Sequence, residues 1–225
     1  MEFRLFRTTE KFNEGSKYFE KEKARLIELT KFERKWYEKG INSIAGTDEA
    51  GRGPLAGPVV AAAVILPKGL LIEGVNDSKK VSEVKRERLY EIIIKEALAW
   101  GVGIVDNNII DEINILNAAK EAMKKAVENL KFQPEVLLID AVKLEIPELI
   151  EESIVKGDAK SISIAAASII AKVTRDRIIR EYDKKYPDYG FAKNKGYGTA
   201  EHMEAIRRNG LCEIHRRTFT KNIIG

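Results

Sequence analysis

The chain of 225 residues contains little cysteine and histidine and no long apolar run. Its one cysteine, Cys212, excludes an internal disulfide and fits a reducing cytosol, so we expect a cytoplasmic protein. No apolar run reaches the ~18 residues that a membrane helix requires. The first residues also lack the apolar core and cleavage site of a signal peptide. The sequence therefore predicts no membrane partner.

Several common kinds of site are missing as well. The two histidines, His202 and His215, lie near the end of the chain. Cys212 and His215 form an isolated C-x-x-H pair, which is far short of a zinc site. No Ser-His-Asp arrangement or nucleophile elbow is evident. The glycines match neither GxxxxGK[ST] nor GxGxxG, so no standard phosphate loop is indicated.

The composition that remains is that of a globular protein with a core, since 44% of residues are hydrophobic and 33% are charged. The length is enough for one large domain or for one domain with an appendage, and we place a main domain at 43–225 and a helical extension at 1–42. Apolar residues at helical spacing predict one or two helices in 1–42, which dock on the main domain or on a partner protein. The net charge of +4 is weak evidence for nucleic acid by itself. The last fifth is locally basic, which predicts a phosphate-binding surface or, alternatively, a solvated helix face: Lys193, Lys195, Arg207, Arg208, Arg216, Arg217 and Lys221.

The most informative stretch is 44–66, IAGTDEAGRGPLAGPVVAAAVIL. Two apolar runs flank a turn-rich centre, which predicts two strands of a hairpin in the core. The first strand ends in Asp48 and Glu49, which should face opposite sides of the sheet. Adjacent buried acids lose hydration and repel each other, and a divalent cation relieves that cost. The alternative is a surface turn with two solvated acids.

Further strands are predicted at 97–105, 134–141 and 150–155. Helices are predicted from Ser82 to Lys95, over 106–130, from Ser161 or Ser163 to the residue before Pro187, and over 199–209, with a loop at 190–198. A hairpin followed by crossovers indicates an α/β fold with a mixed central sheet flanked by helices, of which the RNase H-like fold is one example. The strand at 134–141 ends in Asp140, and Asp158 comes just before a helix. Capping of that helix is the structural alternative for Asp158.

Asp48, Glu49, Asp140 and Asp158 could thus meet at one sheet edge. Oxygen ligands without a Cys/His cluster favour Mg²⁺ or Mn²⁺. Two such ions about 4 Å apart can activate water and stabilise the leaving oxygen of a phosphodiester. Metal-dependent phosphoryl hydrolysis is the reaction class indicated, and other two-metal nucleases share this logic.

The sequence resembles the bacterial ribonuclease HII family from about Thr30 to Lys221. The resemblance is carried by AGTDEAGRGPLAGPVV, NDSKKVSEVKRE, IDEINILNAA, LLIDAV, KGDAKSISIAAASIIAKVTRDR, GFAKNKGYGTAEH and EIHRRTF. It implies an RNase H-like fold and makes Asp48, Glu49, Asp140 and Asp158 the catalytic metal ligands for Mg²⁺ or Mn²⁺, with two ions during catalysis. The sister ribonuclease HIII family usually lacks the arginine matching Arg52 and has a glutamate as fourth acid.

The resemblance also implies substrate contacts. Gly51, Arg52 and Gly53 would sense the 2′-hydroxyl of a ribonucleotide, Ser78 and Lys79 would contact phosphate, and Tyr197 would pack on the following sugar. Without the resemblance, Tyr197 reads as a core or loop tyrosine.

We therefore expect a monomeric endonuclease that cuts on the 5′ side of ribonucleotides in RNA·DNA hybrids and in duplex DNA, leaving 3′-hydroxyl and 5′-phosphate ends. Such an enzyme would serve DNA repair and replication, by ribonucleotide excision and by removal of primers and hybrids. The rivals are another structure-selective two-metal nuclease and a non-catalytic RNA·DNA-binding module.

Overall fold

The computed structural model describes residues 2–6 and 15–224. A five-stranded sheet lies at its centre, in the order β5 (Ala99–Val105), β3 (Val59–Ile65), β2 (Ile44–Ala50), β6 (Val136–Asp140) and β7 (Ile150–Ile154). The β5–β3 and β3–β2 pairs are antiparallel, whereas the β2–β6 and β6–β7 pairs are parallel. The prediction of a mixed sheet that begins with a hairpin is confirmed.

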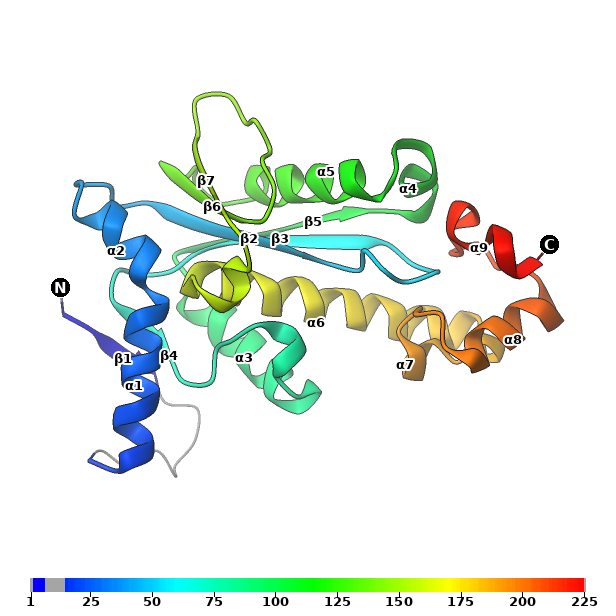
Figure 1. Cartoon of the computed structure of the whole chain (residues 1–225), viewed down its shortest axis with the longest axis horizontal. Coiled ribbons are helices and arrows are strands. Elements are labelled where there is room, and N and C mark those ends of the chain that lie inside the picture. Colours follow the sequence, from blue (N-terminus) through cyan, green and yellow to red (C-terminus); the bar gives the residue numbers. More distant parts are fainter. Residues whose placement is uncertain (1, 7–14, 225) are drawn as a thin grey trace.

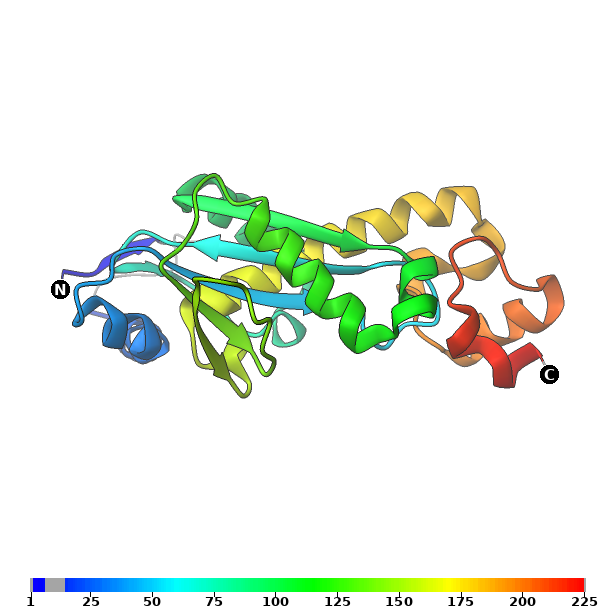
Figure 2. The same ribbon diagram turned by 90° about the horizontal axis from the view of Figure 1, so that it is seen from above.

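Helices cover both faces of this sheet (Figures 1 and 2). The long helix α6 (Ile162–Lys185) lies on one face with α3 (Glu83–Glu96) beside it, and α5 (Ile115–Glu128) lies on the other. Gly46 allows β2 to approach α6 closely, because a Cβ there would overlap the backbone of Ser163 and Ile164. The central strands are consequently buried on both sides, as their continuous apolar runs require.

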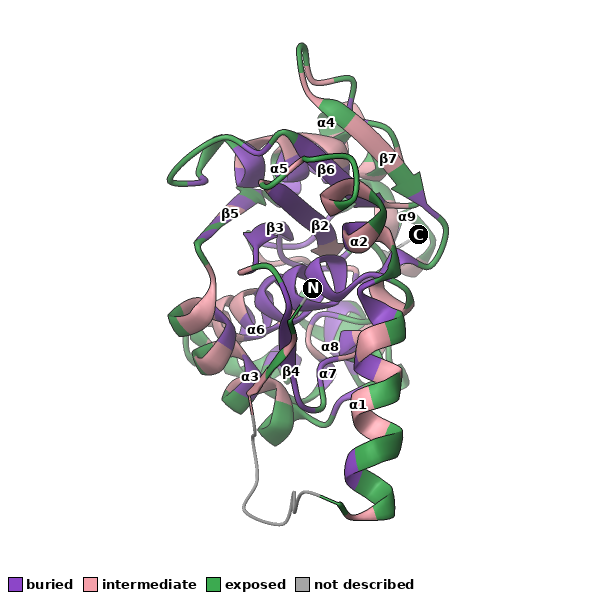
Figure 3. Cartoon of the chain, turned by 90° about the vertical axis from the view of Figure 1, so that its left-hand side faces the viewer, coloured by how far each residue is buried: buried purple, intermediate pink, exposed green. Residues whose placement is uncertain are grey.

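The N-terminal segment packs on the α6 side of the sheet. It contains β1 (Arg4–Phe6), which pairs in parallel with β4 (Leu70–Ile72), followed by α1 (Lys17–Leu29) and α2 (Lys31–Tyr37). The buried stripe of α1 faces the body of the molecule, and its outer face is exposed (Figure 3). Leu26 and Leu29 join the core beneath α6, and Phe32 and Trp36 pack against a second cluster that includes Val136. The helices predicted in 1–42 are present from Lys17 on, and the part of that prediction at 7–14 lies outside the described residues.

Glu33 in α2 is buried at the start of α6. Its Oε1 atom accepts hydrogen bonds from the Ser161 hydroxyl at 2.5 Å and from the Ser163 N–H at 3.0 Å. Burial raises the pKa of Glu33, and these two donors oppose the shift. A carboxylate at a helix N-terminus also interacts favourably with the helix dipole. The N-terminal segment thereby supplies part of the cap of α6.

Removing that carboxylate should destabilise the fold. Glu33→Ala leaves two buried donors without their acceptor, and we expect it to lower the free energy of unfolding by about 2 kcal/mol or more. Chemical denaturation would measure this loss. The matched control is Glu28→Ala on α1, whose side chain is 73% exposed and lies 4.0 Å from Lys31. Equal stability of the two variants would refute the capping role.

The structure corrects some predicted elements. The helix expected over 106–130 is two helices, α4 (Asn107–Ile113) and α5, because Asn114 adopts a φ of 66° and its side chain caps α5. The segment expected as a loop at 190–198 contains a short helix, α7 (Phe191–Asn194). The short strands β1 and β4 were not predicted. The remaining elements are the short helices η1 (Ser78–Lys80), η2 (Gly157–Ala159) and η3 (Pro187–Tyr189), then α8 (Ala200–Asn209) and α9 (Arg217–Ile224).

The basic C-terminal segment is only partly a surface. Lys193, Arg207, Arg208, Arg217 and Lys221 are exposed, but Arg216 is fully buried. The prediction of an exposed arginine was wrong at that position, because its guanidinium is used inside the molecule. Among the described residues no helix is long and apolar enough to cross a membrane.

Candidate functional site

Three adjacent strands end at one edge of the sheet and deliver acidic residues there. In the parallel pairing of β2 with β6, Thr47 lies opposite Ile139, so the residues that follow, Asp48 and Asp140, emerge side by side. The parallel strand β7 pairs with β6 up to Asp140 and leads into η2, which carries Asp158. The predicted meeting of strand-end acids therefore follows from the sheet topology.

Asp48 is buried rather than part of a solvated turn, with only 5% of the residue exposed. Its Oδ1 atom accepts a hydrogen bond from the Glu49 N–H at 2.7 Å. Burial raises the pKa of Asp48 well above its ordinary value, and the charges of Glu49 and Asp140 raise it further, against a hydrogen bond from Ser168. A cation bound here would offset both burial and repulsion.

Glu49 lies on the more open side of this pair. Burial raises the pKa of its carboxyl, Arg52 lowers it, and Asp140 raises it. The Arg52 guanidinium lies 3.6 Å from Glu49 Oε1, and the Arg52 side chain is 47% exposed. The pair is open to solvent only on its Arg52 side, since the Glu49 side chain is 12% exposed.

Asp158 lies at the same edge but does not cap α6. That helix is capped by Ser161, whose hydroxyl accepts from the Ile164 N–H at 3.2 Å, together with Glu33. Burial, and then repulsion from Asp77 and Asp140, raises the pKa of Asp158. Asp77 is thus a fifth acid of the cluster. It stands in the NDSKK motif beside Ser78 and Lys79, but sequence reasoning gave it no role.

These acids are hard oxygen donors whose mutual repulsion a divalent cation would relieve, so their chemistry fits Mg²⁺ or Mn²⁺. One oxygen each of Asp48 and Asp140 is held by a backbone N–H, from Glu49 and from Gly157 at 2.6 Å. Among residues 2–6 and 15–224, no three Asp, Glu, His or Cys side chains are arranged closely enough to hold one ion. Side chains of the cluster would therefore have to move closer together to hold a metal ion.

The turn after β2 is built on two buried arginines. Gly51 has a φ of +102°, and a Cβ there would overlap Arg175 Nε. The Arg216 guanidinium donates to the carbonyls of Gly51 at 2.6 Å, Arg52 at 3.0 Å and Gly57 at 2.8 Å. Arg216 thereby fixes the Gly51–Arg52 half of the Gly-Arg-Gly turn and ties it to Gly57.

Arg175 fixes the segment of the hairpin that leads into β3. From α6, its guanidinium donates to the carbonyls of Pro58 at 3.0 Å, Ala56 at 3.0 Å and Lys195 at 2.9 Å. Burial lowers the pKa of Arg175 to about 10 and that of Arg216 to about 9. No residue pattern distinguishes an arginine that binds carbonyls from one that binds phosphate, and so Arg216 was assigned to the surface.

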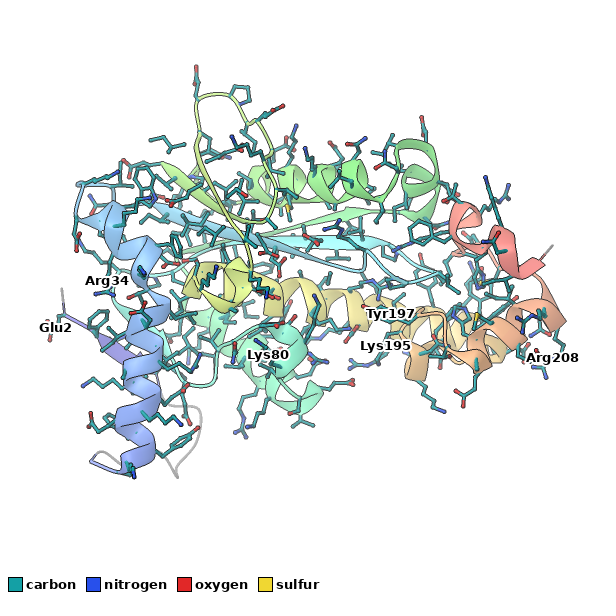
Figure 4. All side chains as sticks on the ribbon, in the orientation of Figure 1. Glu2, Arg34, Lys80, Lys195, Tyr197 and Arg208 are labelled. Atoms are coloured by element: carbon teal, nitrogen blue, oxygen red, sulfur yellow. The ribbon has the colours of Figure 1, made fainter. Side chains whose placement is uncertain are left out.

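The remaining predicted residues flank the turn and the acids. Tyr197 is 42% exposed, and a Cβ added at Gly53 would meet its ring carbon Cε1 at 3.6 Å. Figure 4 shows Tyr197 and Lys195 at the end of the molecule formed by α7 and α8. Tyr197 is therefore not a core tyrosine: it lies in the loop between α7 and α8, as part of an open surface beside the turn.

Ser78 and Lys79 lie next to the acid cluster. The buried Ser78 hydroxyl accepts a hydrogen bond from Ser168 at 2.9 Å, and Ser168 also lowers the pKa of Asp48. Lys79 lowers the pKa of both Glu49 and Asp158, which shows that its charge faces the acids. The structure thus places the four predicted acids at or next to the edge where the parallel strands end, with η1 beside them, and Tyr197 beside Gly53 of the turn.

The comparisons with known proteins agree with this arrangement. Residues 45–222 match the family model described as Ribonuclease HII. The chain is 60% identical over 221 residues to the ribonuclease HII of Acetivibrio thermocellus, covering 98% of this chain and 86% of that protein. It is 59% identical over 207 residues to the ribonuclease HII of Caldanaerobacter subterraneus, covering 92% of this chain and 86% of that protein.

Solved structures show the same fold. The crystal structure of ribonuclease H2 from Pyrococcus horikoshii superposes with a TM-score of 0.67 and 30% identity over 81% of this chain and 97% of that one. The ribonuclease HII of Archaeoglobus fulgidus, solved in a complex with PCNA, gives a TM-score of 0.65 and 30% identity over the same shares. A ribonuclease HIII structure in complex with Mn²⁺, 22% identical over 81% of this chain and 69% of that one, shares the fold with a TM-score of 0.61. The RNase H-like fold is confirmed.

Proposed function

The chain belongs to the ribonuclease HII family of endoribonucleases, and from this premise we propose that it hydrolyses the phosphodiester on the 5′ side of a ribonucleotide. The substrates are RNA·DNA hybrids and duplex DNA with single embedded ribonucleotides, and the products carry 3′-hydroxyl and 5′-phosphate ends. The observation that carries the proposal is the contiguity of the acid cluster with the Gly-Arg-Gly turn, since Asp48 and Gly51 are three positions apart on one hairpin.

Asp48, Glu49, Asp140 and Asp158 are the proposed ligands of Mg²⁺ or Mn²⁺, two ions being required during cleavage. When bound, the ions would supply the activation of water and the stabilisation of the leaving oxygen. The protein keeps Asp48 ready for this task by burying it and holding one of its oxygens at the Glu49 N–H. Asp77, whose charge raises the pKa of Asp158, would add to the negative charge that attracts the ions.

The Gly-Arg-Gly turn is the proposed sensor of the 2′-hydroxyl. The Gly53 side of the turn faces open space except for Tyr197, so its backbone can approach a sugar closely. Arg216 occupies the Gly51 and Arg52 carbonyls and thereby fixes which backbone groups remain available. A fixed backbone with free polar groups can distinguish RNA from DNA through the 2′-hydroxyl.

Tyr197 and the pair of Ser78 and Lys79 are the proposed contacts on either side of the scissile bond. Tyr197 offers an exposed ring to the sugar that follows the ribonucleotide. Lys79 is a cation beside the acids and would hold a backbone phosphate, and the Ser78 backbone would assist it. We further propose a cytoplasmic monomer that serves DNA repair and replication. Light scattering in solution tests the monomeric state. We propose the exposed outer face of α1 as the contact surface for a protein partner.

The direct test uses two duplexes of the same sequence, one with a single ribonucleotide and one entirely of DNA. We expect cleavage of the first only, in Mg²⁺ and in Mn²⁺, because the turn reads the 2′-hydroxyl. Cleavage of both would indicate a structure-selective nuclease instead. Binding without cleavage in either ion would indicate a non-catalytic module.

Replacing the Tyr197 ring should alter the choice among ribonucleotide substrates. Tyr197→Ala removes an apolar surface for the sugar at the RNA–DNA junction, so we expect the ratio of single-ribonucleotide to plain-hybrid cleavage to fall about tenfold, the size of a lost stacking contact. Tyr197→Phe keeps the ring and serves as the control, with a ratio near that of the wild type. An unchanged ratio in the alanine variant would remove Tyr197 from the site.

A further inference from the structure

The two histidines of the chain are both buried and take no part in the proposed chemistry. His202 in α8 is 0% exposed, and His215, which precedes α9, is 2% exposed. Their Nε2 atoms lie 3.1 Å apart, and the rings of Tyr189 and Phe191 pack around them. Burying two titratable rings in contact is costly unless each polar ring nitrogen has a hydrogen-bond partner.

The hydrogen bonds of this histidine pair (His202 and His215) have one consistent direction. The Cys212 N–H donates to His215 Nδ1 at 2.9 Å, so that nitrogen carries no proton. The His215 proton is then on Nε2 and is donated to Nε2 of His202. His202 in turn carries its proton on Nδ1, which donates to the Tyr197 carbonyl at 2.8 Å. Two neutral rings satisfy every one of these bonds, each with a single tautomer.

The histidine pair connects the two segments that carry the proposed recognition groups. His215 forms an isolated β-bridge with Ala56, and the Gly57 N–H donates to the neighbouring Ile214 carbonyl at 2.8 Å. At the other end, the bond from His202 holds the backbone of Tyr197. The pair therefore links the hairpin turn that contains Gly53 to Tyr197, whose ring lies beside Gly53.

We propose that His202 and His215 are positioning residues that hold Tyr197 beside the Gly-Arg-Gly turn, and that they do so only while both rings are neutral. This inference rests on the proposed role of Tyr197 in substrate choice. A proton added to either ring would place two N–H groups face to face at the His202–His215 contact or would disrupt the bond from Cys212. Either change would push the rings out of this arrangement and so move the Nδ1–H donor of His202 away from the Tyr197 carbonyl.

The surroundings favour the neutral state. The groups that face the pair are the rings of Tyr189 and Phe191, the Cys212 thiol and the Tyr197 carbonyl. Among the charged neighbours, Glu213 is exposed and bonded to Lys185, and the Arg216 guanidinium is bonded to carbonyls of the turn. In the described part of the chain no carboxylate forms an ion pair with either ring.

The pKa values change accordingly. Burial lowers the pKa of His202, and burial together with the neighbouring His202 lowers the pKa of His215 to about 4. Since both folded-state values lie below the ordinary value of His, the pair is neutral at pH 7 and loses its arrangement only as the pH falls toward the lowered values.

Nitrogen NMR of the folded protein tests the arrangement without any substrate. We expect His202 as the Nδ1–H tautomer and His215 as the Nε2–H tautomer at pH 7, with neither ring titrating near pH 6.5. The opposite tautomers, or titration of either ring at its ordinary pKa, would overturn the proposal. This measurement stands even if the chain proves not to cut ribonucleotides.

Substitution tests the consequence for substrate choice. His202→Leu removes the donor to Tyr197, and we expect the ratio of single-ribonucleotide to hybrid cleavage to fall about fivefold, the effect of one lost hydrogen bond. His202→Asn can place its side-chain N–H where Nδ1–H stood, and it should restore most of the ratio. In a Tyr197→Ala background, His202→Leu should lower the ratio no further.

A purely structural role gives a different pattern. It would lower cleavage of both substrates equally, leave the ratio unchanged and persist in the Tyr197→Ala background. That outcome would refute the positioning role. Wild-type cleavage of the plain hybrid, measured first, separates this failure from a failure of the proposed function.

Discussion

Asp48→Asn is expected to lose about a thousandfold or more in metal-dependent cleavage and to be at least as stable as the wild type without metal. The loss follows because a divalent ion contributes several kcal/mol to stabilising the transition state, and about 4 kcal/mol corresponds to a thousandfold in rate. The fold should survive, since an amide oxygen can still accept from the Glu49 N–H, and the substitution removes a buried charge that Glu49 and Asp140 repel.

The pH dependence of stability tests whether Asp48 is a buried carboxyl with a raised pKa. Because the pKa of Asp48 is raised in the folded state, the folded protein binds more protons than the unfolded chain between the ordinary and the raised value, and stability without metal falls as the pH rises through that interval. Thermal unfolding in chelator should show this decline in the wild type and a smaller one in Asp48→Asn. Added Mn²⁺ should raise the melting temperature of the wild type more than that of the variant.

Binding of the uncleaved duplex is the control for Asp48→Asn. Its affinity, measured without divalent ions, should stay near the wild-type value, since the turn and Tyr197 are untouched. Normal turnover by Asp48→Asn, or identical pH profiles of stability for the two proteins, would contradict the assignment of Asp48 as a buried metal ligand.

The second large effect is expected at Arg216. Arg216→Met leaves the carbonyls of Gly51, Arg52 and Gly57 without their donor inside the protein. Each buried acceptor without a partner costs about 1–3 kcal/mol, so the free energy of unfolding should fall by about 3 kcal/mol or more. Chemical denaturation measures the loss, and Arg217→Met at the exposed neighbouring arginine is the matched control for stability.

Arg216→Lys keeps the prediction testable if the methionine variant fails to fold. A lysine keeps the charge but cannot place donors on three carbonyls in the fixed geometry of a guanidinium. We expect a folded protein that discriminates less between the ribonucleotide duplex and its all-DNA counterpart. Wild-type discrimination in Arg216→Lys would show that the turn does not depend on this arginine.

Much of the site follows from local patterns in the sequence. A continuous apolar run such as Val59–Ile65 requires a strand buried on both faces, and a strand that ends in Asp48 or Asp140 places an acid at the sheet edge. The parallel order of β2, β6 and β7 then brings the acids together. The resemblance to a known family supplied the roles of Tyr197 and of Ser78 with Lys79, which spacing alone did not indicate.

What the sequence could not show depends on contacts between distant residues. Arg216 and Gly51 are separated along the chain and meet only because the C-terminal segment passes the turn. An arginine looks the same in sequence whether it is exposed or buried, so this one was placed on the surface. Asn114 likewise fits a helical pattern, yet its side chain ends one helix and caps the next.

The measurement that tests the central claim most directly is the mapping of cleavage products from a duplex with one embedded ribonucleotide in Mg²⁺. The account predicts a single cut on the 5′ side of the ribonucleotide, with a 3′-hydroxyl on one fragment and a 5′-phosphate on the other, and no cut when a chelator removes the metal. Products with a 2′,3′-cyclic phosphate, or cleavage that persists in chelator, would show that the 2′-hydroxyl attacks the phosphate itself and would contradict hydrolysis at the metal-binding acids.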